Sequence, residues 1–129
     1  MDFVEYNLDT KLKQCVDETY CLPHTPKVVN GLRASTADIF VDNAAFREFL
    51  FKELEVSTVD EESAAVVMVA TSNGVPSIVF RGVSDLAGGA DQKVSSSLYS
   101  LAAFNAFNVA VEFIELIGKE NIIPYLKES

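Results

Sequence analysis

V-P-S-I-V-F-R-G-V-S-D-L-A-G-G, residues 75–89, carries the strongest structural signal in this chain. Its apolar and β-branched run, Ser77–Phe80, predicts a strand that is buried on both faces of a parallel sheet. Three glycines at and beyond the strand exit predict a flexible loop, which carries Ser84 and Asp85. Ligands of open α/β sheets bind outside the carboxyl ends of the strands, so Asp85 is a candidate site residue. The alternative interpretation is that Asp85 only caps the loop or a following helical turn.

Length and charge restrict the class of protein. The chain has 129 residues, of which 49% are hydrophobic and 22% are charged, and its formal net charge is −9. This length predicts one globular domain, and the acidic balance offers no basic patch for a phosphate backbone, so we do not expect nucleic acid as a partner. The first residues, Met1–Glu5, lack the basic and apolar regions of a signal peptide, which favours the cytoplasm. A secretory or vacuolar location would require a longer precursor.

Two cysteines and one histidine restrict the metal chemistry. Cys15 and Cys21 have a spacing that fits no zinc motif, and His24 lies alone beside them. We therefore expect no metal site and no cofactor. The two thiols either form a small-loop disulfide in an oxidising compartment or stay reduced in the cytosol.

The rest of the chain alternates predicted strands and helices. Residues 1–26 contain two prolines and predict an irregular opening segment, part-helical around Thr10–Thr19. Gly31–Asp38 is polar and is predicted to be a connection. The other predicted strands are Lys27–Val29, Ile39–Val41 and Val56–Val59, and the predicted helices are Ala44–Leu54 with Asp42 as N-cap, Ala64–Ala70, and Ser95–Gly118.

The helices differ in the faces that they are expected to bury. Ala64–Ala70 is apolar all round, so we expect it to be buried on most sides and to end at Asn73 and Gly74. Ser95–Gly118 carries one narrow polar stripe, which a membrane span would not tolerate, and we expect it to cover a sheet with that stripe outward. The elements together predict an α/β layered domain. The stripe consists of Asn105, Asn108, Glu112, Glu115 and Lys119.

Polar residues follow the predicted strand ends. Glu61 and Glu62 come after Val56–Val59 and would lie in the first turn of the apolar helix, where the macrodipole alone favours acidic residues. The alternative is that one carboxylate faces the interior and binds partners such as sugar hydroxyls. Arg81 is expected to pair with a nearby acid such as Asp85 or Glu62, because a half-buried guanidinium needs an acid.

Phe40 ends a predicted strand and is either a core residue or a ring that stacks on a ligand. The sequence has no Gly-x-Ser-x-Gly elbow, no P-loop and no dinucleotide-binding fingerprint.

Two motifs in order carry a family resemblance. Val59–Ala65, V-D-E-E-S-A-A, is followed further along the chain by Phe80–Asp85, F-R-G-V-S-D. The pair resembles the signature of the purine nucleoside phosphorylase and methylthioadenosine nucleosidase superfamily, in particular its plant branch, which includes bark storage proteins. Gly31–Ser35 and Phe40–Asn43 are similar to that branch as well, and the resemblance spans Thr25–Glu120.

The resemblance implies a three-layer α/β sandwich and cleavage of the N-glycosidic bond of a purine nucleoside, with phosphate or water as the acceptor. Asp85 is implied to protonate the leaving purine, Glu62 to hold the ribose hydroxyls, Phe40 to pack on the base and the Val41 backbone to contact the base edge. Such roles suit a transition state that needs a proton on the leaving group and an anchored sugar. The candidate residues are thus Asp85 as the catalytic acid, Phe40, Val41, Glu61, Glu62 and Ser84 as substrate-binding residues, and Arg81 as a supporting residue.

Two departures from the family pattern bear on function. Family nucleosidases carry Met before the sugar-binding Glu, whereas this chain has Glu61. The family's glycine-rich cradle for phosphate or water, which lies in the first half of the domain, has no counterpart here. The chain, 1–129, thus resembles the carboxyl-terminal part of a longer domain, and an unpaired sheet edge would favour a homo-oligomer. Two functions stay open, a nucleoside-cleaving enzyme or its remnant, and a non-catalytic storage protein of the same fold.

Overall fold

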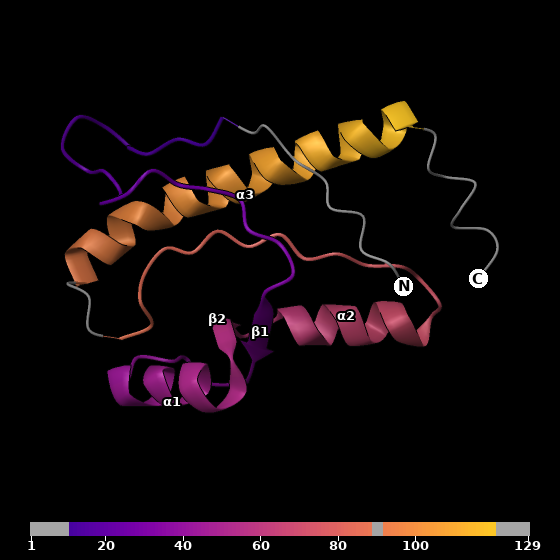
Figure 1. Ribbon diagram of the computed structural model, residues 1–129, viewed down its shortest axis with the longest axis horizontal. Helices are drawn as coiled ribbons and strands as arrows, with labels where there is room; N and C mark the ends of the chain where they lie inside the picture. Colours follow the sequence, from indigo (N-terminus) through magenta and orange to yellow (C-terminus); the bar gives the residue numbers. More distant parts are fainter. Residues whose placement is uncertain (1–10, 89–91, 121–129) are drawn as a thin grey trace.

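The computed structural model describes residues 11–88 and 92–120 and is α/β, with a small parallel sheet between helices (Figure 1). The three predicted helices are all present, and the last is longer than predicted at both ends. The elements, in chain order, are β1 (Arg33–Thr36), α1 (Ala44–Leu54), β2 (Val56–Asp60), α2 (Ser63–Ser72) and α3 (Gln92–Glu120).

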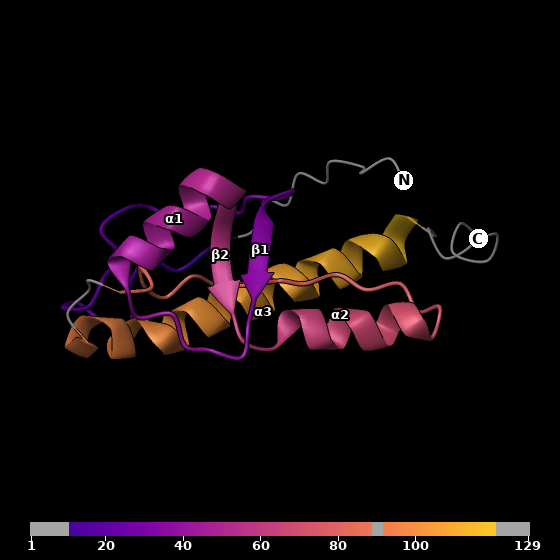
Figure 2. The same ribbon diagram turned by 90° about the horizontal axis from the view of Figure 1, so that it is seen from below.

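The described sheet has two parallel strands, β1 and β2, joined through α1. Thr36 at the end of β1 lies opposite Asp60 at the end of β2, so both carboxyl ends meet at one edge. Figure 2 shows the two arrows side by side and pointing the same way, with α2 leaving from that edge. The residues that follow each strand are thereby brought together.

The first strand is not where the sequence pattern placed it. Lys27–Val29 and Ile39–Val41 form no strand, and β1 lies instead at Arg33–Thr36, inside the segment predicted as a polar connection. Pairing with β2 decides the position of β1. At the end of the two strands the Ala37 amide donates to the Asp60 carbonyl, and the Thr36 hydroxyl donates to the Asp60 carboxylate. Cross-strand contacts therefore outweigh the β-propensity of the apolar runs.

Helix α1 has the predicted bounds but a different N-cap. The Asn43 side chain accepts a hydrogen bond from the Phe46 amide, whereas Asp42 was expected to cap the helix. The helix ends at Glu55, which has a left-handed backbone (φ 55°) and donates its amide to the carbonyls of Leu50 and Phe51. Leu50 and Val56 are buried where α1 and β2 adjoin.

The predicted strand Ser77–Phe80 is wrong, because this segment runs without regular structure between α2 and α3. A strand needs a paired neighbour, and none pairs with this segment among residues 11–88 and 92–120. The segment packs on α3 instead, where the Phe80 and Phe113 rings lie 5.3 Å apart. Gly82 passes so close to the Ala102 carbonyl that a Cβ at this position would clash.

Helix α3 buries a different stripe from the one predicted. Leu98, Leu101 and Val109 are buried, and so is Asn105, at 8% exposed. The Asn105 side chain accepts a hydrogen bond from the Lys13 N–H and donates one to the Lys13 C=O. These backbone groups take the place of water, so the polar side chain can be buried. The predicted outward position of Asn105 is therefore wrong. Phe107 faces outward with 66% of its surface exposed.

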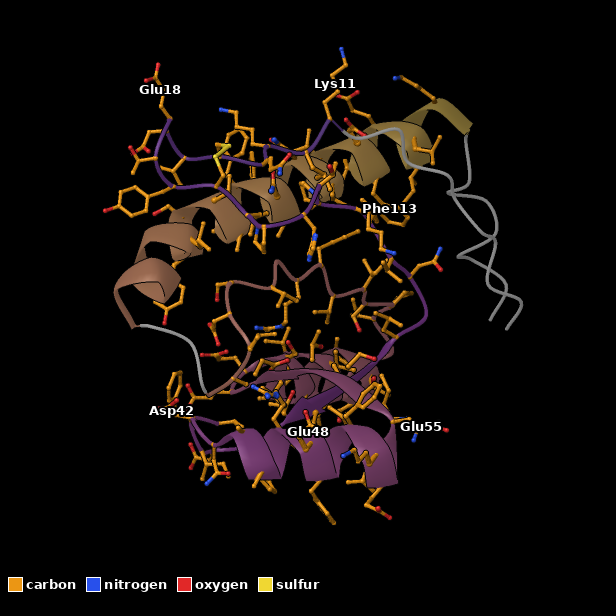
Figure 3. The ribbon with its side chains drawn as sticks, turned by 60° about the vertical axis from the view of Figure 1, so that its left-hand side comes forward. Lys11, Glu18, Asp42, Glu48, Glu55 and Phe113 are labelled. Carbon is orange, nitrogen blue, oxygen red and sulfur yellow. A yellow bond between two sulfur atoms is a disulfide. The ribbon has the colours of Figure 1, made fainter. Side chains whose placement is uncertain are left out.

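Residues 11–30 form an irregular segment along α3, and none of residues 11–19 is helical, contrary to the part-helical prediction. Cys15 and Cys21 form a disulfide, which answers the question that the sequence left open. Its yellow bond is visible beside α3 in Figure 3, where Lys11 and Glu18 of this segment point away from the molecule.

The other long apolar segments are more exposed than expected. Helix α2 was predicted to be buried on most sides, yet it has no buried residue, and Met68 is 65% exposed. Val67 and Ala70 are half-buried, and the other apolar residues of the helix are exposed. Within α3, Leu98–Lys119 is long and apolar enough to cross a membrane by length and composition alone, a criterion that packed helices of globular domains also meet.

Candidate functional site

A cavity of about 200 Å³ opens at the carboxyl ends of the two strands. Segments that are far apart in sequence line it: the turn after β1, the β2–α2 junction, the segment between α2 and α3, and α3 itself. All seven residues singled out from the sequence lie on its wall. The lining residues are Ile39, Phe40, Val41, Val59, Asp60, Glu61, Glu62, Arg81, Ser84, Asp85, Ala87 and Tyr99.

Asp60 forms the structural centre of this wall. Its Oδ1 accepts hydrogen bonds from the Thr36 hydroxyl at 2.8 Å and from the amides of Glu62 and Ser63 at 3.0 and 2.8 Å. Its Oδ2 lies 3.2 Å from Arg81 Nη2, and the side chain is 0% exposed. One carboxylate therefore joins the end of β1, the start of α2 and the segment that carries Arg81.

These contacts keep Asp60 ionised. Burial by itself raises the pKa of Asp60, but hydrogen bonds from the Ser63 backbone, the Thr36 hydroxyl and the Glu62 backbone outweigh it, and the pKa lies below its ordinary value. The carboxylate also satisfies amides at the N-terminus of α2, which otherwise have no partner within the helix. Asp60 thus acts as the capping group that neither Glu61 nor Glu62 provides.

Arg81 pairs with a nearby acid, as expected, but the acid is neither Asp85 nor Glu62, which were named as examples. Its Nη2 contacts Asp60 and donates to the Ser63 hydroxyl at 2.7 Å. Burial explains this choice. The Asp60 carboxylate is fully buried, and a buried charge is costly unless an opposite charge pairs with it.

Asp85 lies in a tight turn after Arg81. Its Oδ2 accepts from the Ser84 hydroxyl at 2.7 Å, and its Oδ1 accepts from the Ala87 amide at 2.8 Å. Ala87 and Gly88 both have positive φ, 49° and 100°. A carboxyl group held in this way on the wall of a cavity can donate a proton to a bound ligand or accept one from it.

The remaining candidates stand around the same opening. Phe40 is 71% exposed, so its ring is not a core residue in this structure. Val41 is half-buried next to it, and Glu61 and Glu62 are exposed. Glu62 occupies the N-cap position of α2 and Glu61 precedes it, so neither lies in the first helical turn as predicted.

Sequence reasoning missed two polar residues of this wall, Asp60 and Tyr99. Asp60 had a usable signal, since Asp directly before a helix start is a favoured capping residue. Tyr99 had none, because its place on the wall depends on how α3 lies across the strand ends. In the described part of the chain, no group of three or more His, Cys, Asp or Glu could hold a metal ion.

Comparison with known proteins gives consistent matches. A family model described as "Phosphorylase superfamily" matches residues 1–115. Bark storage proteins A and B of Populus deltoides are each 40% identical over 109 residues, which cover 84% of this chain and 34% of theirs. A 5′-methylthioadenosine/S-adenosylhomocysteine nucleosidase of Treponema pallidum (strain Nichols) is 32% identical over 118 residues, which cover 75% of this chain and 43% of that protein. The chain thus spans about a third of the length of the bark storage proteins, and no solved structure matches it.

Proposed function

Because the chain belongs to the phosphorylase superfamily, we propose that it carries the base- and ribose-binding part of a site that cleaves the N-glycosidic bond of purine nucleosides. The observation that carries this proposal is the common cavity, whose wall includes an aromatic ring, Phe40, and two carboxyl groups, Glu62 and Asp85. Cleavage of a purine nucleoside needs an aromatic ring that packs on the base, a carboxylate that binds the ribose hydroxyls, and an acid that protonates the leaving nitrogen.

Each residue has a definite role in the proposed reaction. The Asp85 carboxyl donates a proton to a purine ring nitrogen, so that the base leaves as a neutral species. Glu62 accepts hydrogen bonds from the ribose hydroxyls and holds the sugar as positive charge develops on it. Phe40 packs on the base, the Val41 backbone contacts its edge, and Ser84 orients Asp85. Glu61 lies beside the sugar site, and Arg81 supports the wall through Asp60.

The acceptor of the glycosyl group is phosphate or water. We also propose that residues 1–129 form one partial domain of a three-layer α/β sandwich, with self-association covering its open faces. The coverage of the relatives supports this, because the matched regions are 34% and 43% of their lengths.

A storage protein of the same fold is the second candidate function. The 40% identity to bark storage proteins A and B supports it. Glu61 supports it further, because a second carboxylate beside Glu62 makes the sugar side of the cavity more polar than the methionine of family nucleosidases would.

Purine binding separates the two candidates. Calorimetric titration of the chain with adenine and hypoxanthine should show saturable binding, and Phe40→Ala and Asp85→Asn should each weaken it about tenfold, because each removes one principal contact. Asp38→Asn, which alters an exposed carboxylate in the turn after β1, is the matched control and should bind as the unaltered chain does. An absence of binding, or binding that neither substitution weakens, would favour the storage function.

A further inference from the structure

The peptide group between Leu86 and Ala87 lies between two side chains of opposite charge. Its N–H, on Ala87, donates to Asp85 Oδ1 at 2.8 Å. Its C=O, on Leu86, accepts a hydrogen bond from the Arg47 guanidinium of α1. The guanidinium, the peptide and the Asp85 carboxylate therefore form one hydrogen-bonded chain.

We infer that Arg47 is a positioning residue for Asp85, and this inference rests on the proposed function of Asp85. A cation that donates to the peptide oxygen polarises the peptide and strengthens the hydrogen bond that its N–H gives to the carboxylate. Arg47 does not line the cavity at the strand ends, although it and Asp85 both line a second cavity beside α1. Toward a ligand in the cavity at the strand ends, Arg47 therefore acts through the loop.

A second contact fixes the loop in place. Arg47 Nη1 also donates to the Gly88 carbonyl, so one nitrogen binds the carbonyls on either side of Ala87. Gly88 itself rests on the start of α1, where a Cβ would collide with the backbone of Asn43. The loop is thereby attached to the N-terminal end of α1 by a side chain and by close backbone contact.

The backbone of the loop needs such support. Ala87 adopts a left-handed conformation, with φ 49°, which costs a residue with a Cβ free energy. Conformations of this kind persist only where the surroundings hold them. The Arg47 side chain is 30% exposed, and its one ion pair with a described residue, Glu48, is long at 3.7 Å. Its shortest described contacts are therefore with the two carbonyls of the loop.

The inference is tested on the whole chain by amide hydrogen exchange and purine titration. Arg47→Met removes the donors and keeps the length of the side chain, whereas Arg47→Lys keeps a cation. Lys52→Met is the matched control, because Lys52 is an exposed cation on the same helix that pairs with Glu48. We expect Arg47→Met to raise the exchange rate of the Ala87 amide and to weaken adenine binding about tenfold. Arg47→Lys should retain part of the protection of the Ala87 amide and part of the adenine affinity. Lys52→Met should change neither the exchange rate nor the affinity.

Coupling to Asp85 distinguishes positioning from general support of the fold. In an Asp85→Ala background the Ala87 amide has lost its acceptor, so Arg47→Met should add little to its exchange rate. An Ala87 exchange rate that is unchanged in Arg47→Met would overturn the inference. So would an Arg47→Met effect on this rate that is equally large in the Asp85→Ala background and in the unaltered chain. If the chain binds no purine, the proposed function fails, and the Ala87 exchange rates still decide whether Arg47 holds this loop.

Discussion

Asp60 shows how one residue organises a site without being an obvious candidate. Its carboxylate accepts three hydrogen bonds on one oxygen and contacts a guanidinium with the other, and the side chain has no exposed surface. Residues from β1, α2 and the following segment all depend on it. Glu62 and Arg81 take their places on the cavity wall because Asp60 binds the backbone of the first and the side chain of the second.

Asp60→Ala is predicted to lower the free energy of unfolding by about 2–3 kcal/mol at neutral pH, because it leaves the amides at the start of α2 and the Arg81 guanidinium without their acceptor. The pKa of Asp60 is lowered in the folded state. Its stabilisation is therefore fully present above the unfolded-state pKa of about 3.9 and is lost as the pH falls through the lower folded-state value.

Urea denaturation followed from neutral to acidic pH measures this dependence. The unaltered chain should lose stability over the acid range, and Asp60→Ala should lose less of it there. Asp38→Asn, an exposed carboxylate in the turn after β1, is the control. Equal acid dependence in Asp60→Ala and the unaltered chain would contradict the assignment.

At the level of single residues, the motifs named Phe40, Glu62 and Asp85, which the structure brings to one cavity, although the strands predicted before Phe40 and Asp85 do not form. Their assignment as site residues and their chemical roles stay predictions. The partner of Arg81 could not be predicted, because it depends on which acid is buried more deeply. That is a property of packing and not of the local sequence.

Among the elements, α3 has the most unexpected contact. Asn105 lies in its buried face and binds both backbone groups of Lys13, while Lys13 Nζ lies 4.3 Å from the centre of the Phe104 ring. The disulfide between Cys15 and Cys21 closes the loop that follows. Residues 11–22 are thereby held on α3 although they form no helix or strand.

Asn105→Ala is predicted to lower the free energy of unfolding by about 1–3 kcal/mol, because it leaves the Lys13 N–H and C=O without their side-chain partner. Limited proteolysis should then cut residues 11–22 faster than in the unaltered chain, and thermal denaturation should show the loss of stability. Asn108→Ala, three residues along the same helix and half-buried, is the comparison and should have the smaller effect. Proteolysis of residues 11–22 that is unchanged in Asn105→Ala would show that this contact does not hold the segment.

Helices were predicted more accurately than strands, for a physical reason. The bounds of α1 follow from local capping and spacing, which the sequence contains. A strand exists only if another strand pairs with it. The apolar segment Ser77–Phe80 therefore forms no strand, whereas the less apolar segment Arg33–Thr36 pairs with β2 and becomes β1. The buried stripe of α3 was likewise fixed by distant residues, here the backbone of Lys13.

Across residues 11–88 and 92–120, much apolar surface is exposed. The described core consists of Leu50, Val56, Leu98, Leu101 and Val109, while α2 and the segment after it expose many large apolar side chains. A two-stranded sheet also leaves strand edges unpaired, which favours association. Both features agree with the proposals of a partial domain and of self-association, since further sheet and helix would bury these faces.

The 129-residue chain alone is predicted neither to phosphorolyse nor to hydrolyse purine nucleosides at a useful rate. Protonation of the leaving base by Asp85 is worth about 10²–10⁴-fold in rate, which is only part of what glycosyl transfer needs. Positioning of the acceptor contributes separately, on the order of 7–11 kcal/mol in favourable cases. We expect that contribution from a glycine-rich segment that has no counterpart in these 129 residues.

The measurement is release of free purine from adenosine, inosine and methylthioadenosine by the purified chain, with and without phosphate. Purine binding without turnover would agree with a site that holds base and ribose but lacks a positioned acceptor. Turnover that disappears in Asp85→Asn would contradict the prediction. It would show that the cavity at the strand ends positions the acceptor as well, and that the residues lining it suffice for the complete reaction.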